Sequence, residues 1–237
     1  MRIARRCWGR SLAHVRSLAY VRSLVYVRSL VYVRSLVYVR SLVYMLLLGM
    51  SLNHGAQAQD VKAHEAYVHP ESKLQFPANL GNSRRLSVQN YQDPRLGIAV
   101  TYQVAGLGRA DFYVYQSGHG QVPSGINSEP MQRALFDAHS DVTEAVRRGA
   151  YVAADPLFPS SNTYELPNRI PRIYFSAYRL SRASQLNQPM VSWMFMTGMA
   201  NHFVKIRISH SELQMPTGQE RVAETLGAFF AANRDYW

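Results

Sequence analysis

The chain has 237 residues, a length that fits one domain or two. Its 26 basic and 15 acidic side chains give a formal net charge of +11, which is typical of proteins that bind nucleic acids or anionic surfaces. Nine of the arginines lie in residues 1–58, which contain no acidic residue, so residues 59–237 carry a net charge of only +2. We therefore expect no nucleic-acid binding by residues 59–237. The single cysteine, Cys7, also lies in the N-terminal part, which excludes disulfides and cysteine chemistry from the rest.

The N-terminal part begins with a short repeat. Residues 10–45 are six tandem copies of a hexapeptide that starts Arg-Ser-Leu, and this period is too short for a helical repeat unit. We interpret the repeat as a tolerated expansion. The alternative is a tail that binds anionic lipid or nucleic acid.

A secretory signal peptide is predicted over residues 1–58. The basic repeat is followed by an uncharged, mainly apolar segment, 41–52, and then by the small residues Ala56 and Ala58. Basic, apolar and small residues in this order are typical of a signal peptide. The apolar segment is shorter than the about 20 residues that span a bilayer. We therefore expect cleavage between Ala58 and Gln59, a periplasmic or secreted protein, and no transmembrane segment in the mature chain.

The mature chain is predicted to start with a flexible lead-in, 59–77, because this segment is polar and has no sustained apolar period. A single domain over 78–237 follows. It contains seven segments that are rich in β-branched and aromatic residues and predict strands. They are 85–91, 97–104, 110–116, 151–153, 172–180, 190–196 and 202–208.

Two main helices are predicted, at about 129–148 and 218–233. The first has a capping residue in Asn127 or Ser128 and one apolar stripe, formed by Met131, Leu135, Ala138, Val142 and Val146. The second has a capping-box pattern in Thr217 and Glu220 and a face that we expect to be buried, formed by Val222, Leu226, Phe229 and Phe230. The order of the elements and the short connections predict an α+β fold, with a mostly antiparallel sheet of about six or seven strands.

Several short motifs resemble a group of small exported bacterial proteins of unknown function. They are Tyr91-Gln-Asp-Pro-Arg-Leu-Gly97, Ala99-Val-Thr-Tyr102, Asp111-Phe-Tyr-Val-Tyr115 and Phe203-Val-Lys-Ile-Arg207. The order of strands and helices also resembles, more faintly, the Mog1/PsbP-like α/β sandwich. Neither resemblance implies a reaction or catalytic residues.

Two apparent ligand motifs fail on spacing. The segment 120–125 has the glycine spacing of a phosphate-binding loop, but Ile126 and Asn127 follow where Lys and Ser or Thr are required. His64 and His69 are five positions apart, whereas the histidines of a zinc protease motif are four apart on one helical face. We therefore predict no metal, no cofactor and no assignable catalytic residue.

Two acidic residues of the first helix, Asp137 and Asp141, are spaced like a carboxylate pair. They share the polar face of the helix with Arg133 and Arg148. We interpret this face as a solvated, ion-paired surface.

Four residues are candidates for contact with a ligand or partner. Phe203, Lys205 and Arg207 share one face of the last predicted strand, where two cations beside an aromatic ring could receive an anionic group. We favour the other interpretation, in which the aliphatic parts of these cations cover the sheet edge and their charges meet water. Phe136 lies off the apolar stripe of its helix, so it is either exposed or covered by another element.

These observations favour an exported, non-enzymatic accessory or binding protein of the bacterial envelope. One alternative is a small secreted hydrolase with a dispersed site, and another is an anionic-surface binder that retains its arginine-rich leader. A cleft with converging polar groups would favour the hydrolase, and a shallow surface would favour the binding protein.

Overall fold

The computed structural model describes residues 57–59, 64–116, 121–158, 162–164, 172–182 and 188–236. The chain divides into two compact units, Met1–Gly55 and Ala56–Trp237, and all described residues belong to the second. The hexapeptide repeat, the apolar segment and Ala56 lie outside the described residues. The predicted cleavage position, between Ala58 and Gln59, lies within the short first strand, β1.

The described strands form one ten-stranded sheet in which every paired strand runs antiparallel to its neighbour. The main path is β1 (Gln57–Gln59), β5 (Ser83–Asn90), β6 (Ile98–Val104), β7 (Gly108–Tyr115), β12 (His202–Ser211), β11 (Met190–Met199), β10 (Ile173–Ser181) and β8 (Ala153–Pro156). Two short strands pair off this path, β4 (Asn79–Leu80) with β5 and β9 (Asn162–Tyr164) with β10. The predicted α+β class is confirmed. The predicted strand at 151–153 is found as β8. The strand count exceeds the predicted six or seven because β1, β4 and β9, of two or three residues each, are too short to show a period.

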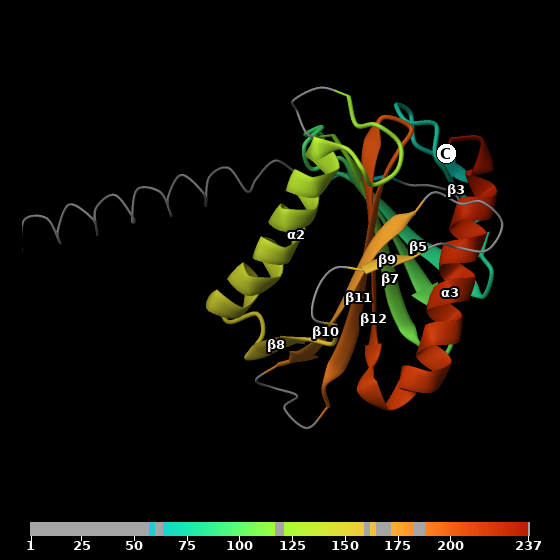
Figure 1. Ribbon diagram of the computed structural model, residues 1–237. Helices are drawn as coiled ribbons and strands as arrows, with labels where there is room; N and C mark the ends of the chain where they lie inside the picture. The colour runs from blue at the N-terminus through green and yellow to red at the C-terminus, as the bar shows by residue number, and fades with distance from the viewer. Residues whose placement is uncertain are drawn as a thin grey trace, which may run out of the picture. The chain divides into compact units, whose positions relative to one another are not determined.

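Two long helices cover opposite faces of the sheet, so that the fold has three layers (Figure 1). They are α2 (Glu129–Arg147) and α3 (Met215–Ala232). Short 3-10 helices, η2 (Glu212–Gln214) and η3 (Arg234–Tyr236), precede and follow α3.

The first helix forms as predicted. The Ser128 side chain accepts a hydrogen bond from the Met131 N–H at 3.4 Å, which caps the N-terminus. Met131, Leu135 and Ala138 are buried and pack in a cluster with sheet residues that include Phe203. The stripe therefore holds the N-terminal half of α2 on the sheet.

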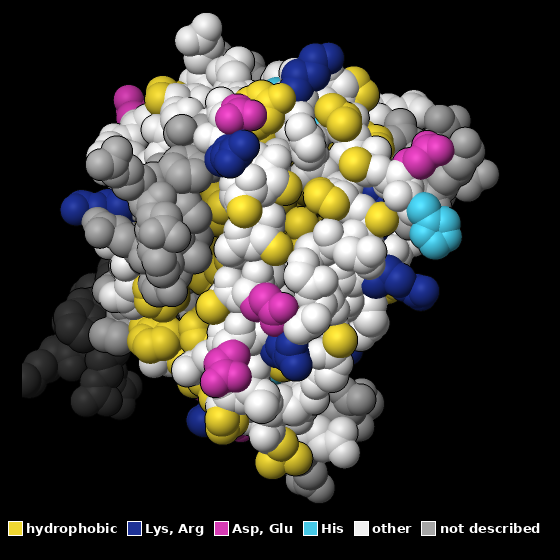
Figure 2. Space-filling model, turned by 90° about the vertical axis from the view of Figure 1, so that its right-hand side faces the viewer, with side chains coloured by type: hydrophobic (Ala, Val, Ile, Leu, Met, Phe, Trp, Pro, Cys, Tyr) yellow, Lys and Arg dark blue, Asp and Glu magenta, His cyan; other side chains and the backbone are white. Residues whose placement is uncertain are grey.

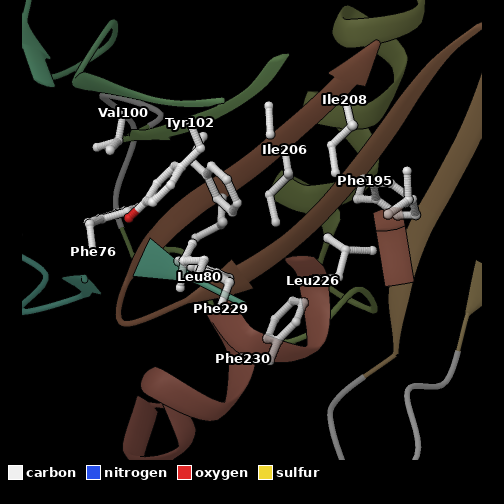
Figure 3. Packing of buried hydrophobic residues seen from close by; sticks show 14 of the residues in the cluster. Phe76, Leu80, Val100, Tyr102, Phe195, Ile206, Ile208, Leu226, Phe229 and Phe230 are labelled. Carbon is white, nitrogen blue, oxygen red and sulfur yellow. The ribbon is translucent and has the colours of Figure 1, made fainter. Parts of the chain in front are cut away.

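The second helix covers the larger core. Figure 3 shows Leu226 and Phe229 of α3 packed with strand residues such as Ile206. The Phe229 ring centroid lies 5.0 Å from that of Phe112 on β7. The helix starts at Met215 rather than 218, and the predicted capping box is wrong, because the Thr217 hydroxyl donates to the Gln214 carbonyl within the helix's first turn. The buried face, in contrast, is confirmed.

Part of the predicted flexible lead-in is folded. Residues 66–76 include a hairpin of β2 (Tyr67–Val68) and β3 (Gln75–Phe76), and Leu74 and Phe76 are fully buried in the α3 core. The prediction of flexibility over 59–77 is therefore wrong for this segment. Its strands have only two residues each, so the apolar alternation was too short to recognise.

The hairpin of β11 and β12 fixes where α2 begins. Ala200 and Asn201 both have positive φ, at 50° and 62°, as a tight two-residue turn requires. Gly198 on β11 exchanges two backbone hydrogen bonds of 2.9 Å with Gly125, in the loop that leads to α2. A Cβ atom at Gly198 would lie 2.0 Å from the Pro123 carbonyl oxygen, so only glycine allows this close approach.

Candidate functional site

A groove of about 840 Å³ lies between α2 and strands β7 and β12. We call it the α2 groove. Its sheet side is formed mainly by aromatic residues and one lysine, and its helix side by charged residues. The lining includes Tyr91, Leu96, Tyr113, Tyr115, Glu129, Arg133, Asp137, Asp141, Phe203 and Lys205.

Strand register places the aromatic residues side by side. In the pairing of β7 with β12, Tyr115 lies opposite Phe203, and Tyr113 lies opposite Lys205. Directly opposed residues of neighbouring strands point to the same face, here the face toward α2. The Tyr115 and Phe203 ring centroids are 5.3 Å apart. The groove therefore has a continuous aromatic floor.

Lys205 is the cation on this floor. Its ammonium nitrogen lies 5.3 Å from the Tyr113 ring centroid and 5.8 Å from that of Tyr115, which is cation–π geometry. Within the described residues the ammonium group has no hydrogen bond and no ion pair. Burial is the main cause that lowers the pKa of Lys205, and repulsion from Arg207 lowers it further. The negative charge of Asp141 acts in the opposite direction. An anionic group in the groove would restore the stabilisation that burial removes.

The helix side of the groove is acidic. Asp137 and Asp141 line it, and both contribute to raising the pKa of Tyr115, after burial as the larger cause. The predicted ion pairs of these aspartates are wrong. Arg133 pairs with Glu129 at 2.6 Å, and Arg148 pairs with Glu144 at 2.6 Å, so both arginines bind acids one turn nearer the N-terminus of α2.

The three candidates on β12 differ in their surroundings. Phe203 is only 2% exposed and packs in the cluster under α2, and it lines the α2 groove together with Lys205. Arg207 points into a polar network instead, where its Nε donates to the Ser192 hydroxyl at 2.9 Å and its Nη2 to the Tyr151 hydroxyl at 3.0 Å. β12 is a central strand, so these side chains do not cover a sheet edge. The shared face is confirmed, and the edge interpretation is wrong.

Phe136, the fourth candidate, is exposed. Its side chain is 71% accessible, and it is not among the residues that line the α2 groove. The sequence left open whether Phe136 is exposed or covered by another element, and the structure shows that it is exposed, on the outer side of α2.

A serine and a histidine approach each other elsewhere, in the folded part of the lead-in. The Ser72 hydroxyl lies 2.7 Å from Nδ1 of His69, and both side chains are buried. The same two atoms also accept hydrogen bonds from the backbone. The Ser72 N–H donates to Nδ1 of His69, and the Leu74 N–H donates to the Ser72 hydroxyl. The pair closes a tight turn, and these bonds oppose its use as nucleophile and base.

His64 and His69 do not form a metal site in the structure. Among the described residues, no group of three or more His, Cys, Asp or Glu side chains is arranged to hold a metal ion. His69 packs against His202 instead, with ring centroids 5.3 Å apart.

Sequence reasoning missed the tyrosines of the groove floor. Tyr113 and Tyr115 alternate with Phe112 and Val114, which are fully buried on the α3 side. This alternation could have shown that both faces of β7 are covered. It could not have shown that the tyrosines lie beside Lys205, because that depends on pairing with a strand about 90 residues away.

No helix of the described residues is long and apolar enough to cross a membrane. No family model, curated protein or solved structure matches the chain. The resemblance to small exported bacterial proteins and to the Mog1/PsbP-like sandwich therefore stays a prediction.

Proposed function

We propose that the chain is a non-enzymatic binding module exported to the bacterial envelope, and that its ligand lies in the α2 groove. The observation that carries this proposal is the half-buried Lys205, which lies over two tyrosine rings and has no ion pair within the described residues. A desolvated cation with no carboxylate in direct contact is stabilised by an anionic ligand. The aromatic floor adds contact with an apolar or aromatic part of the same ligand.

Charge on the helix side limits the kind of ligand. Asp137 and Asp141 lie across the groove from Lys205 and repel a second negative group. The ligand that fits is a small molecule with one anionic group near Lys205 and an aromatic body on Tyr113, Tyr115 and the neighbouring Tyr91.

The chemistry of the lining supports binding over hydrolysis. The groove is a cleft rather than a shallow surface, which by shape alone favours the hydrolase, so the case for binding depends on the chemistry of its lining. The described lining residues include tyrosines, carboxylates, arginines, one glutamine and one lysine, but no serine, threonine, cysteine or histidine. A hydroxyl or thiol nucleophile beside a histidine, which the common hydrolase arrangements use, is not part of this lining.

The export part of the proposal rests on the predicted signal peptide. The described surface agrees with a near-neutral mature protein: on the α3 side, acidic and basic side chains are interspersed (Figure 2). A mixed surface of this kind offers few adjacent cations to an anionic membrane or nucleic acid.

A fluorescent aromatic monoanion, 1-anilinonaphthalene-8-sulfonate, tests the groove. We expect saturable binding to the native full chain, and about tenfold weaker binding to Lys205→Gln because a partly desolvated ion pair is lost. Phe136→Ala is the matched control, because it removes an exposed aromatic ring outside the groove. Equal affinities for the wild type and Lys205→Gln would contradict the proposed site.

A further inference from the structure

A second pocket, of about 510 Å³, lies on the same side of the sheet as the α2 groove, toward the other end of β12. Three segments that are distant in the sequence contribute to it: Tyr151 follows α2, Arg182 follows β10, and Arg207 is part of β12. Arg109 and Asp111 of β7 complete the charged groups of its lining. We call this pocket the arginine pocket.

Two guanidinium groups converge on one phenol in this pocket. The guanidinium carbons of Arg182 and Arg207 lie 5.6 Å and 5.9 Å from the centroid of the Tyr151 ring. Arg207 also donates a hydrogen bond to the Tyr151 hydroxyl at 3.0 Å. Two like charges held near one ring repel each other, and this repulsion is relieved when an anion lies between them.

The pocket has more cations than acids. Asp111 is its carboxylate, and it is already bound by Arg109 at 2.7 Å and by the Thr101 hydroxyl at 2.7 Å. Within the part of the chain that the structure describes, no carboxylate forms an ion pair with Arg182 or Arg207. Their charges are therefore available to a ligand.

Arg207 is held in place before any ligand arrives. Its Nε donates to Ser192, and the Ser192 hydroxyl also accepts from Ser209 at 2.9 Å. Because β12 is a central strand, the backbone of Arg207 is fixed as well. Two of the five N–H donors of the Arg207 guanidinium form hydrogen bonds within the described residues, which leaves donors for an incoming oxygen anion.

We propose that Arg182, Arg207 and Tyr151 form an anion-binding site that takes a phosphate group. Guanidinium groups match the oxygens of a phosphate in a two-point fork, and the Tyr151 hydroxyl adds a neutral donor. This site goes beyond the proposed function, since it uses a different pocket and different side chains from those of the α2 groove. The phosphate group can come from inorganic phosphate or from a small phosphate monoester.

The first test is a titration of the full chain with inorganic phosphate and, separately, with glycerol 3-phosphate, at constant ionic strength. We expect Arg182→Gln and Arg207→Gln to bind about tenfold more weakly than the wild type, because each loses one charge-assisted contact. Arg148→Gln is the matched control, since it removes the same charge from α2 outside the pocket. Binding that is weakened by the two pocket variants supports the site. Tighter binding of the ester identifies a phosphate monoester as the source of the phosphate group, and tighter binding of inorganic phosphate identifies the free ion.

The second test uses the wild type alone and does not depend on the variants folding. Burial acts to raise the pKa of Tyr151, but Arg207 and Arg182 outweigh it and hold this pKa below the usual tyrosine value. The other charged groups that line pockets with Tyr151 are Arg109, Asp111, Asp141 and Lys205. Phosphate bound to the two arginines should raise the pKa of Tyr151, because linkage between two sites is reciprocal.

Tyrosinate absorbance measures this effect. We expect the component that ionises first to disappear in Tyr151→Phe, and to move to higher pH when phosphate is added to the wild type. Two results would overturn the proposal. One is a failure of both probes to bind, and the other is equal affinity in Arg182→Gln, Arg207→Gln and Arg148→Gln, which would indicate general surface charge. Loss of sulfonate binding by Lys205→Gln with phosphate binding intact would separate this site from the α2 groove.

Discussion

Asn233, just past the end of α3, forms hydrogen bonds with both backbone groups of Gln75 on β3. Its Oδ1 accepts from the Gln75 N–H at 2.7 Å, and its Nδ2 donates to the Gln75 carbonyl at 3.0 Å. Nδ2 also donates to the Phe229 carbonyl at 2.9 Å, and the side chain is fully buried. One amide thus takes the place of a neighbouring strand and attaches the β2–β3 hairpin to α3.

Replacing this amide should destabilise the protein strongly. In Asn233→Ala the backbone N–H and C=O of Gln75 lose a fully buried partner, and we expect a loss of about 2–4 kcal/mol in the free energy of unfolding. Urea denaturation measures this loss. Arg234→Ala is the control, because it changes the next, exposed residue and should cost less than about 0.5 kcal/mol. Similar losses in the two variants would show that the Asn233 contacts contribute little.

The buried face of α3 predicts a second pair of variants. Phe229 is fully buried and contacts the rings of Phe76, Phe112 and Phe230, so Phe229→Ala should cost about 3–5 kcal/mol. Glu220, exposed on the same helix, should tolerate alanine with a change below about 0.5 kcal/mol. Chemical denaturation compares the two, and equal effects would contradict the assignment of the buried face.

Replacing two of the glycines with alanine should change the free energy of unfolding in opposite directions. In Gly198→Ala the new Cβ would meet the Pro123 carbonyl, so the loop before α2 must shift and both bonds to Gly125 weaken. We expect a loss of about 2 kcal/mol or more. In Gly227→Ala, within α3, the Cβ meets nothing within 4 Å, and we expect a gain of about 0.5–1 kcal/mol. Thermal unfolding of the two variants measures both signs, and destabilisation by Gly227→Ala would be inconsistent with this account.

Acid should destabilise the protein through His69. Burial lowers the pKa of His69 to about 4, with repulsion from His202 adding to it and Glu71 opposing it. In the unfolded chain a histidine has a pKa of about 6.5. Below that pH His69 binds a proton in the unfolded state but not in the folded state. Stability is therefore retained above about pH 6.5 and lost as pH falls toward 4, by up to about 3 kcal/mol.

The pH dependence of unfolding in His69→Gln measures this contribution. We expect a smaller difference in unfolding free energy between pH 7.5 and pH 4.5 than in the wild type. His64→Gln, at an exposed position, is the control and should keep the wild-type difference. An unchanged difference in His69→Gln would assign the acid sensitivity to other groups.

The protein isolated from its native envelope should begin at Gln59. Ala56 and Ala58 are small enough for the signal peptidase, and the apolar segment before them is too short to span a bilayer. Cleavage there would also remove Gln57 and Ala58 from β1, so that only Gln59 of β1 would stay paired with β5, whose other end pairs with β4. Intact-mass measurement, with allowance for cyclisation of an N-terminal glutamine, decides the point. Recovery of the arginine repeat on the native protein would favour the anionic-surface alternative.

Local sequence patterns determined the elements of this fold. The spacing of Met131, Leu135 and Ala138 and the cap at Ser128 are sufficient for α2, because a helix depends on neighbours three and four positions away. The long strands could be predicted for the same reason, since alternation along one segment reports which side chains share a face. The N-terminal arginines are another local pattern, and they explain why the whole chain has a net charge of +11 although residues 59–237 have only +2.

Only the tertiary structure decided which of these elements meet. Leu74 and Phe76 looked like isolated apolar residues until α3 and Asn233 covered them. The sequence already named Lys205 as a candidate, but only the register of β12 with β7 showed that it lies beside Tyr113. Arg182 and Arg207 lie beside the same Tyr151 ring only because of the way β10 and β12 are arranged in the folded sheet. Such contacts join segments tens of residues apart, and they form because the whole sheet is stable, not because of any preference within one segment.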